Sequence, residues 1–205
     1  LPDFGRDDTQ AFLVGNTRQF WPVFIEFLSE NPDWLDAEDP IDRYTEKQIG
    51  TTVDTIEPET EIIWAHRAEP DFFPMRKVAE EAEFAAGSPC EMSIHPDYGL
   101  WFGLRAVVVL DRRVELISEK MSSEQKPCIE CHEPCVTQLN IALDKEDATW
   151  RDWARVRLSC PASPEAQYAD NQLMYHYLKD RRYLRRGVRL HGSFSFERKG
   201  FVEEE

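Results

Sequence analysis

The placement of cysteine is the feature that most restricts how this chain can fold. Three of the five cysteines, Cys128, Cys131 and Cys135, fall within eight positions of the segment KPCIECHEPCVTQ, and Cys160 follows in a Cys-Pro pair. Two thiolates in a C-x2-C spacing bind one metal because the turn between them points both sulfurs inward. An odd number of cysteines clustered in this way fits a metal site in a reducing compartment better than a set of disulfides. A four-ligand site needs Cys160, which is distant in sequence.

Three interpretations of these thiols stay open. The first is a four-iron four-sulfur cluster on Cys128, Cys131, Cys135 and Cys160, since a cysteine before proline is the usual last ligand of ferredoxin-type runs. The C-x2-C-x3-C spacing of this chain lacks one C-x2 unit of the standard C-x2-C-x2-C-x3-C-P run. The second is zinc, with His132 as a possible ligand, and the third is a set of ordinary free thiols. Cys90 is left over, and we expect it to be a buried small apolar residue.

Composition excludes several classes of partner. The 205 residues include 24 Lys and Arg against 39 Asp and Glu, for a net charge of −15, which disfavours broad contact with nucleic acid or anionic lipid. Hydrophobic residues make up 41%, enough for the core of one domain. No stretch reaches the roughly 18 to 20 apolar residues of a membrane span, and the opening LPDFGRDDTQ has neither a basic nor an apolar leader region. We expect a cytoplasmic protein.

Apolar patterning predicts strands between helices. Helical spacing predicts helices over 20–28, from Pro74 to a C-terminal cap at Gly87, and over 168–178, while apolar runs predict strands at 11–15 and 61–66. The Asp- and Pro-rich segment 31–42 is expected to be a surface loop. The run from Met92 to Leu110 predicts two strands joined at HPDYG, the expected central hairpin. Antiparallel pairing around it favours an α+β fold.

Two arginines and the missing motifs narrow the chemistry. Arg105 stands in the apolar run LWFGLRAVVVL and Arg151 in WRDW. A guanidinium among apolar neighbours needs a carboxylate or an anionic ligand, so an internal ion pair and a ligand site are both open. His95 is expected to fix the HPDYG turn by a backbone hydrogen bond, with a position at a cavity rim as the alternative. The C-terminal arginines are expected to form a solvated face or to pair with the acidic surface. The chain has no G-x-G-x-x-G, Walker or G-x-S-x-G motif, which disfavours nucleotide and serine-hydrolase sites.

Longer segments resemble the cobalamin-processing proteins of the CblC type. These are SIHPDYGLWFGLRAVVVL and ATWRDWARVRLSCPASPEAQYADNQLMYHY, with AFLVGNTRQFWPVFIEFL and DPIDRY before them, over about residues 11–178. The most specific parts are I-H-P-x-[FY]-G-x-W-F-x-[IL]-R and WRDW. A shorter resemblance, the hairpin followed by a cysteine cluster, is to epoxyqueuosine reductase and the reductive dehalogenases, which share a corrinoid-binding core. The Asp-x-His-x-x-Gly motif that supplies a lower cobalt ligand in many corrinoid enzymes is absent.

The resemblance implies a nitroreductase-like α+β fold with a central, mainly antiparallel sheet flanked by helices. It divides the chain into a corrinoid-binding domain (1–118 and 136–190), a cysteine-rich metal-binding insertion (119–135) and a C-terminal tail (191–205). It also implies that cobalamin binds base-off and loses its upper ligand, with alkyl groups passing to glutathione and cyanide leaving reductively.

The resemblance further implies roles for individual residues. Arg105 and Arg151 match arginines that hold the glutathione carboxylates by forked hydrogen bonds, and they are the expected catalytic residues. The strand that matches 90–94 lies against the corrin, with Leu104 on its partner. The expected corrin contacts are therefore Cys90, Met92, Ser93, Ile94 and Leu104. Glu91 stands where the family has a glycine.

Three functions follow as hypotheses. The first is a reductive decyanase or dealkylase of cobalamin that receives electrons from a donor protein or thiol through an iron-sulfur cluster. The second is a cobalamin chaperone with structural zinc, and the third is a small flavin-dependent relative of the nitroreductases. In each case the partner is a small molecule, not nucleic acid or membrane, and the protein is a monomer or homodimer.

Overall fold

The computed structural model describes residues 9–56, 60–67, 73–111, 127–129 and 131–200. These residues form two compact units. The first unit comprises the described residues within 1–17 and 48–167, and the second those within 18–47 and 168–205. Each unit is described by itself.

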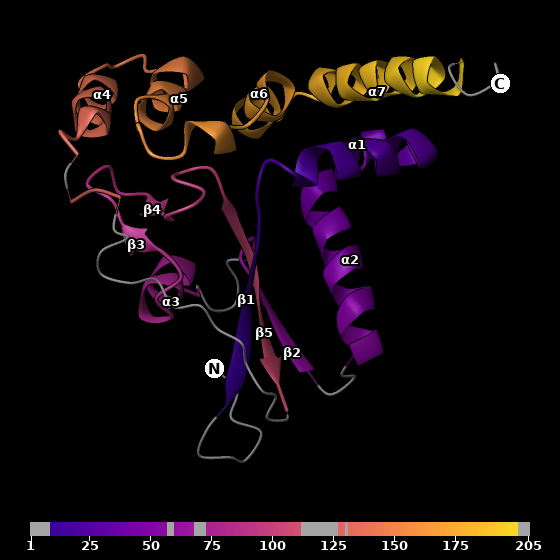
Figure 1. Cartoon of the computed structure of the whole chain (residues 1–205), viewed down its shortest axis with the longest axis horizontal. Coiled ribbons are helices and arrows are strands. Elements are labelled where there is room, and N and C mark those ends of the chain that lie inside the picture. Colours follow the sequence, from indigo (N-terminus) through magenta and orange to yellow (C-terminus); the bar gives the residue numbers. More distant parts are fainter. Residues whose placement is uncertain (1–8, 57–59, 68–72, 112–126, 130, 201–205) are drawn as a thin grey trace. The chain divides into compact units, whose positions relative to one another are not determined.

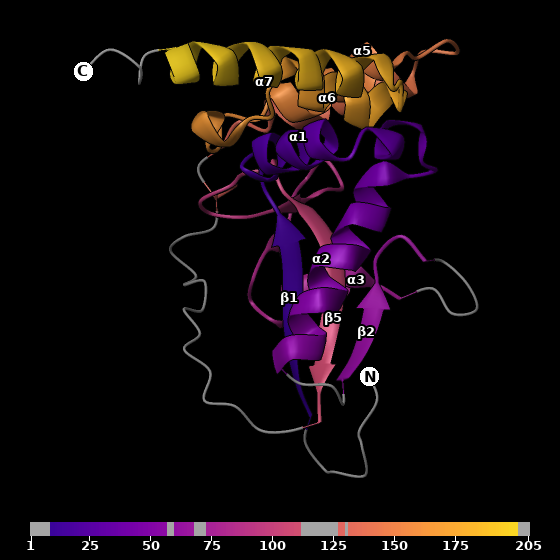
Figure 2. The same ribbon diagram turned by 90° about the vertical axis from the view of Figure 1, so that its right-hand side faces the viewer.

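A three-stranded antiparallel sheet forms the centre of the first unit, with strand order β1-β5-β2 (Figures 1 and 2). The strands are β1 (Gln10–Asn16), β5 (Gly103–Leu110) and β2 (Thr60–Trp64). The middle strand carries the run AVVVL, in which every side chain is buried, as expected for a strand that is paired on both edges and covered on both faces. Both neighbours meet its end, since Gln10 and Thr60 each align with Leu110.

The predicted central hairpin over 92–110 is wrong. The turn itself is present, because His95 and Gly99 exchange backbone hydrogen bonds of 2.9 and 2.8 Å. His95 also fixes the turn as predicted, since its Nδ1 accepts a 3.0 Å hydrogen bond from Asp97 N. The flanking strands, however, belong to different sheets: β4 (Ser93–Ile94) pairs with β3 (Ala86–Gly87), whereas β5 joins the central sheet. Long-range pairing thus overrides the local hairpin pattern.

Helices complete the first unit. The second half of α2 (Pro40–Ile56) belongs to it, and α3 (Met75–Glu81) starts after Pro74 as predicted. The predicted cap at Gly87 is wrong, because α3 already ends at Glu81 and Gly87 lies in β3. Further along, α4 (Pro134–Leu143) and α5 (Trp150–Leu158) pack against each other, and the short η3 (Pro164–Ala166) follows.

The second unit is helical. It contains α1 (Phe20–Glu30), η1 (Pro32–Asp36), the start of α2, α6 (Asp170–Leu178) and α7 (Arg182–Gly200). Its buried cluster consists of Trp21, Phe24, Ile25, Leu28, Ile41, Tyr44, Tyr175 and Leu184. The expected surface loop over 31–42 is therefore wrong in part, because η1 and the first residues of α2 lie within it. As predicted, C-terminal arginines pair with acidic residues, for example Arg185 with Asp36.

The predicted mixture of helices and antiparallel sheet is confirmed. Strands and helices predicted at 11–15, 61–66, 20–28 and 168–178 correspond to β1, β2, α1 and α6, whereas α2, α4, α5 and α7 are not predicted from the sequence. Most of the predicted cysteine-rich insertion lies outside the described residues, so the insertion and the domain division stay predictions. Across the described ranges, no helix is both long and apolar enough to cross a membrane.

Candidate functional site

All five cysteines line one narrow hollow in the first unit, which we name the thiol pocket. The cysteines are Cys90, Cys128, Cys131, Cys135 and Cys160, and all are free thiols. The hollow has a volume of about 10 Å³, room for about one water-sized body. Its remaining walls are mostly apolar: they include Pro89, Ile94, Leu100, Pro127, Pro161 and Ala162. The fold thus brings Cys160 beside the three clustered cysteines, and it adds Cys90.

A tight loop between β3 and β4 places Cys90. Ser88 N donates to Met92 O at 2.8 Å, and Glu91 N donates to Ser88 O at 3.0 Å, so the chain reverses around Cys90. Glu91 adopts a φ of +63°, in the left-handed region that favours glycine. This backbone conformation gives a physical reason for a glycine at that position in the resembling family. The Glu91 side chain itself is mostly exposed.

Turns and helix ends place the other four thiols. Cys131 N donates to Cys128 O at 3.3 Å, which closes the turn between these two cysteines. Cys135 is in the first turn of α4, directly after Pro134, a residue that suits a helix start. Cys160 follows the end of α5 and is held by a 3.3 Å hydrogen bond from its N to Arg157 O.

The HPDYG turn holds the segment after Cys160. Ser163 Oγ donates to Pro96 O at 3.0 Å. Gly99 has a φ of +54°, and a Cβ there would lie 2.5 Å from Ala162 O. Only glycine allows this close approach of the two backbones. The turn therefore fixes the position of Cys160 from two residues away.

Burial favours the protonated form of three of the thiols. It raises the pKa of Cys128 and Cys160, and it raises that of Cys135 to about 12, with neighbouring thiols as a further cause in each case. Within the described residues, no three His, Cys, Asp or Glu side chains are already arranged to hold a metal ion. A metal must therefore displace the thiol protons and draw the sulfurs together. The donor set, four or five thiols in one apolar pocket, is that of zinc or an iron-sulfur cluster.

A second hollow, which we name the large cavity, lies beside the thiol pocket. Its volume is about 750 Å³, and its walls come from α3, the 91–93 loop, residues 100–104 and α5. Its apolar lining includes Phe73, Met75, Met92, Leu100, Phe102 and Leu104, and its charged lining consists of Arg76, Lys77, Glu80, Glu81, Glu91 and Arg157. Leu100 lines both hollows. The volume lies in the range of small-molecule sites, and about half of the lining residues are polar or charged.

Two polar side chains mark the wall of the large cavity. The Ser93 hydroxyl is buried and, among the described residues, has no hydrogen-bond partner. Since a buried hydroxyl normally has a partner, Ser93 points to a ligand group in the cavity. Arg157 lies with its Cζ 5.5 Å from the centroid of the buried Trp101 ring, and its Nη2 donates to Met92 Sδ at 3.9 Å. Sequence reasoning missed Arg157; its one signal is a position on the helix that leads into Cys160.

The predicted corrin contacts separate into two groups. Met92, Ser93 and Leu104 line the large cavity, whereas Cys90 and Ile94 are buried against the thiol pocket. The segment 90–94 thus forms a wall between the two hollows: its ends, Cys90 and Ile94, line the thiol pocket, and residues 91–93 line the large cavity.

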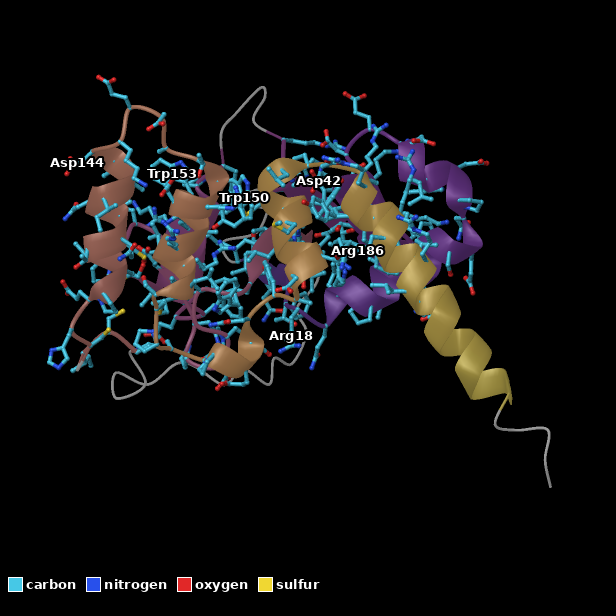
Figure 3. The ribbon with its side chains drawn as sticks, turned by 90° about the horizontal axis from the view of Figure 1, so that it is seen from above. Arg18, Asp42, Asp144, Trp150, Trp153 and Arg186 are labelled. Atoms are coloured by element: carbon cyan, nitrogen blue, oxygen red, sulfur yellow. The ribbon has the colours of Figure 1, made fainter. Side chains whose placement is uncertain are left out.

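The predicted catalytic arginines lie elsewhere in the first unit. Arg105 is half-buried on β5, where its O accepts a 2.9 Å hydrogen bond from Ala65 N. Arg151 is exposed on α5, and its Cζ lies 4.7 Å from the centroid of the Trp150 ring. Figure 3 shows Trp150 on that helix, together with Trp153. Neither arginine is among the described residues that line the large cavity.

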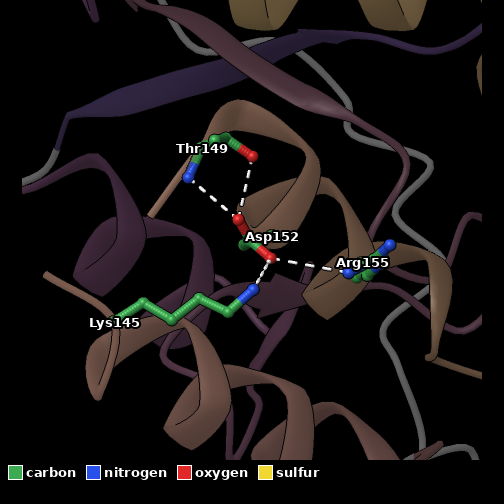
Figure 4. Close-up of polar contacts among 4 residues, drawn as sticks. All are labelled: Lys145, Thr149, Asp152 and Arg155. Atoms are coloured by element: carbon green, nitrogen blue, oxygen red, sulfur yellow. Dashed lines mark hydrogen bonds and ion pairs between the residues drawn. The ribbon is translucent and has the colours of Figure 1, made fainter. Parts of the chain in front are cut away.

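Asp152, the acidic residue of WRDW, has a structural role (Figure 4). Its carboxylate accepts hydrogen bonds from Thr149 N at 2.9 Å and Thr149 Oγ1 at 2.8 Å, and it also pairs with Lys145 and Arg155. The Lys145 hydrogen bond, followed by those from Thr149, holds the pKa of Asp152 well below its usual range. Asp152 therefore fixes the start of α5, the helix that carries Arg157 and ends before Cys160.

Comparisons with known proteins support the corrinoid resemblance. A family model described as the methylmalonic aciduria and homocystinuria type C family matches residues 64–184, more than half of the chain. Among solved structures, the chain is similar to a B12-trafficking protein CblC of C. elegans, described as a homologue of human MMACHC. The match has a TM-score of 0.66 and 19% identity, and it covers 92% of this chain and 82% of the other. At this identity the likeness is one of fold. No curated protein matches the chain.

Proposed function

The chain belongs to the methylmalonic aciduria and homocystinuria type C family, and from this premise we propose that it binds cobalamin base-off and removes the upper axial ligand reductively. The observation that carries the proposal is the large cavity, with its apolar walls and the Ser93 hydroxyl. A corrin ring is a broad apolar plane fringed by amide groups. Such a ligand buries its plane against Met92, Phe102 and Leu104 and offers an amide to Ser93.

The charged side chains of the large cavity suit the fringe of this ligand. Arg76, Lys77 and Arg157 are donors, and Glu80 and Glu81 are acceptors, so both halves of an amide find partners. Glu91 pairs with Arg76 at 4.0 Å. We assign Met92, Ser93 and Leu104, which line the large cavity, to corrin contact. The nitroreductase-like description of the fold belongs to the same proposal.

The upper ligand leaves by one of two routes, which differ in where the electron pair of its bond to cobalt goes. In decyanation, one electron reduces cobalt from the +3 to the +2 state, and cyanide leaves with the electron pair of its bond. In dealkylation, a glutathione thiolate attacks the alkyl carbon, a thioether forms, and cobalt keeps the electron pair as cob(I)alamin. Arg105 and Arg151 are the proposed ligands of the glutathione carboxylates.

The proposal for decyanation includes an iron-sulfur cluster on Cys128, Cys131, Cys135 and Cys160. When bound, such a cluster supplies single electrons, which a cytoplasmic donor protein or a thiol replaces. The gathering of all five thiols in one pocket beside the large cavity supports this route. The chain's own contribution is an apolar, water-poor setting for the sulfurs and a thin wall toward the substrate.

One observation favours a second candidate function. The thiol pocket has room for about one water-sized body, which suits a single zinc ion better than a four-iron cluster. A cobalamin carrier with structural zinc would use the same large cavity without electron transfer. Metal analysis of protein purified under anaerobic conditions distinguishes the two, because iron with sulfide supports the reductase and zinc supports the carrier.

The experiment that tests the proposed function is titration of the protein with cyanocobalamin, followed by its visible spectrum. Binding is expected to give the base-off spectrum, and added reductant is expected to give cob(II)alamin with release of cyanide. Ser93→Leu places bulk in the large cavity, so it should weaken binding by about tenfold or more. Ser29→Leu on the exposed face of α1 is the matched control and should bind normally. Absence of any spectral change with the wild-type protein would overturn the proposal.

A further inference from the structure

Cys90 belongs to the thiol pocket as fully as the clustered cysteines do. Its side chain is 3% exposed and packs in one apolar cluster with Cys135 and Cys160, while Cys128 packs against that cluster. Among the described members of this cluster, Cys131 is absent, although it lines the pocket. Two other chain segments, 128–135 and the one that carries Cys160, therefore meet at Cys90.

Cys90 is close to three of the other four thiols. Cys135 and Cys160 pack in the same buried cluster as Cys90, Cys128 packs against that cluster, and all three interact electrostatically with Cys90. Cys131 interacts in this way with Cys128 and Cys160. Cys128 and Cys160 also interact with three or more of the other thiols, so Cys90 is as much a part of the group as these two cysteines are.

We propose that Cys90 is a ligand of a thiolate-bound metal centre in the thiol pocket, together with Cys128, Cys135 and Cys160. The inference rests on the cysteine site of the proposed function and changes its ligand set, leaving Cys131 outside. Four thiolates satisfy a tetrahedral ion such as zinc, and they also satisfy a four-iron four-sulfur cluster. Each of the four thiols releases one proton as its sulfur binds the metal.

Ser88 is placed to support this ligand. Its Oγ lies 3.2 Å from Cys90 Sγ and 2.7 Å from Met92 O. Since the hydroxyl proton is given to Met92 O, the Cys90 thiol is the donor toward Ser88 Oγ. Once Cys90 is a thiolate, the hydroxyl turns to donate to its sulfur, an outer-shell hydrogen bond of the kind that tunes a metal centre.

The position of Cys90 gives the metal centre a short route to the large cavity. The next residues along the chain, Glu91, Met92 and Ser93, line that cavity, and Leu100 lines both hollows. Cys90, as a ligand of the metal, is thus joined through the backbone to the residues that line the large cavity. Cys160 provides a second link, because Arg157, whose O accepts the hydrogen bond from Cys160 N, also lines that cavity.

The test compares Cys90→Ala with Cys131→Ala in the full chain, reduced and freed of metal under argon. Each protein is titrated with Co²⁺ alone, whose thiolate complexes absorb in the visible range, and is separately reconstituted with Fe²⁺ and sulfide. Cys90→Ala is expected to weaken Co²⁺ binding by about 100-fold or more and to abolish cluster formation. Cys131→Ala is expected to keep both within about fivefold of the wild type. Binding of Co²⁺ without cluster formation indicates a site for a single ion, and cluster formation from Fe²⁺ and sulfide indicates an iron-sulfur site.

The reverse pattern, with Cys131 required and Cys90 dispensable, overturns the inference, as does failure of the wild type to bind metal in both arms. A folding control is urea unfolding of each variant, and Cys90→Ser retains the size of the side chain. The base-off shift with cyanocobalamin is recorded on the same samples. If that shift is present while metal binding is absent, the ligand assignment fails and the cobalamin proposal stands.

Discussion

The two units differ in what their buried side chains face. In the second unit, aromatic rings fill the interior: Phe24 and Tyr44 lie 5.2 Å apart between ring centroids, and Trp21 and Tyr175 lie 6.0 Å apart. In the first unit, apolar side chains instead surround two hollows, whose walls carry thiols, charges and a buried hydroxyl. The second unit therefore contributes a tightly packed core, whereas the first unit carries the candidate binding sites. Changes in the two units should therefore separate stability from binding.

The largest loss of stability is expected from Phe24→Ala in the second unit. Phe24 is fully buried, and truncation of such a side chain leaves a cavity that costs about 3–5 kcal/mol of the free energy of unfolding. Urea unfolding measures this loss. Val23→Ala, 55% exposed on the same helix, is the control and should cost less than about 0.5 kcal/mol. If Phe24→Ala also removes metal binding from the folded fraction, the separation of the units fails.

Gly99→Ala should affect both stability and the site. The positive φ at Gly99 and the 2.5 Å approach of a new Cβ to Ala162 O predict a cost of about 2 kcal/mol. Because Ala162 follows Cys160 by two residues, uptake of Co²⁺ should fall as well. Gly50→Ala is the matched control, since α2 leaves open space there and alanine should stabilise the helix by about 0.8 kcal/mol. Normal metal uptake by Gly99→Ala would show that the turn does not position Cys160.

Thr149→Ala tests the start of α5 with a smaller effect. Loss of the Thr149 hydroxyl removes one hydrogen bond to Asp152 and should cost about 1 kcal/mol. Thermal unfolding measures it, with the exposed Thr55→Ala on α2 as control. Cobalamin binding should change little at temperatures where the variant is folded. An equal loss from Thr55→Ala would show that the α5 start has no special role.

The smallest effect at neutral pH is expected from Tyr175→Phe. Burial raises the pKa of Tyr175 to about 12, with Asp39 as a further cause and Arg181 acting against it. Above pH 10 the unfolded chain releases this proton while the folded chain keeps it, so stability falls as pH rises from about 10 to 12. Tyr175→Phe should flatten that part of the stability profile, which urea unfolding at several pH values records. Tyr183→Phe on α7 is the control, and an unchanged slope in Tyr175→Phe would contradict the prediction.

Local patterns predicted the fold where local preference and long-range packing agree. Helix α1 follows from the spacing of Phe20, Phe24, Phe27 and Leu28, and β1 follows from its short apolar run. The prediction for the 92–110 segment is wrong because the HPDYG turn by itself is typical of a hairpin. In the structure β4 pairs with residues 86–87, and β5 pairs with residues 10–16 and 60–64. The sequence of the 92–110 segment alone does not determine these pairings, because the partner strands are distant in sequence.

Local sequence patterns also predict only part of the candidate site. The clustered cysteines and Cys160 could be grouped from spacing, since a metal needs four ligands. Cys90 could not, because its neighbours in sequence, Pro89 and Glu91, carry no ligand pattern, and only tertiary packing brings it to Cys135. Arg157 was missed for a related reason: its relation to Trp101 and Met92 joins α5 to residues far earlier in the chain.

The position of β5 at the centre of the sheet has a consequence for the newly made chain. Both of its neighbours, β1 and β2, are synthesised before it, and neither pairs with the other in the described structure. Until Leu110 leaves the ribosome, two strands therefore lack the partner that satisfies their backbone groups. Unpaired strands of this kind attract other chains. The interval before β5 emerges is thus the stage of biosynthesis at which this protein depends most on protection from aggregation.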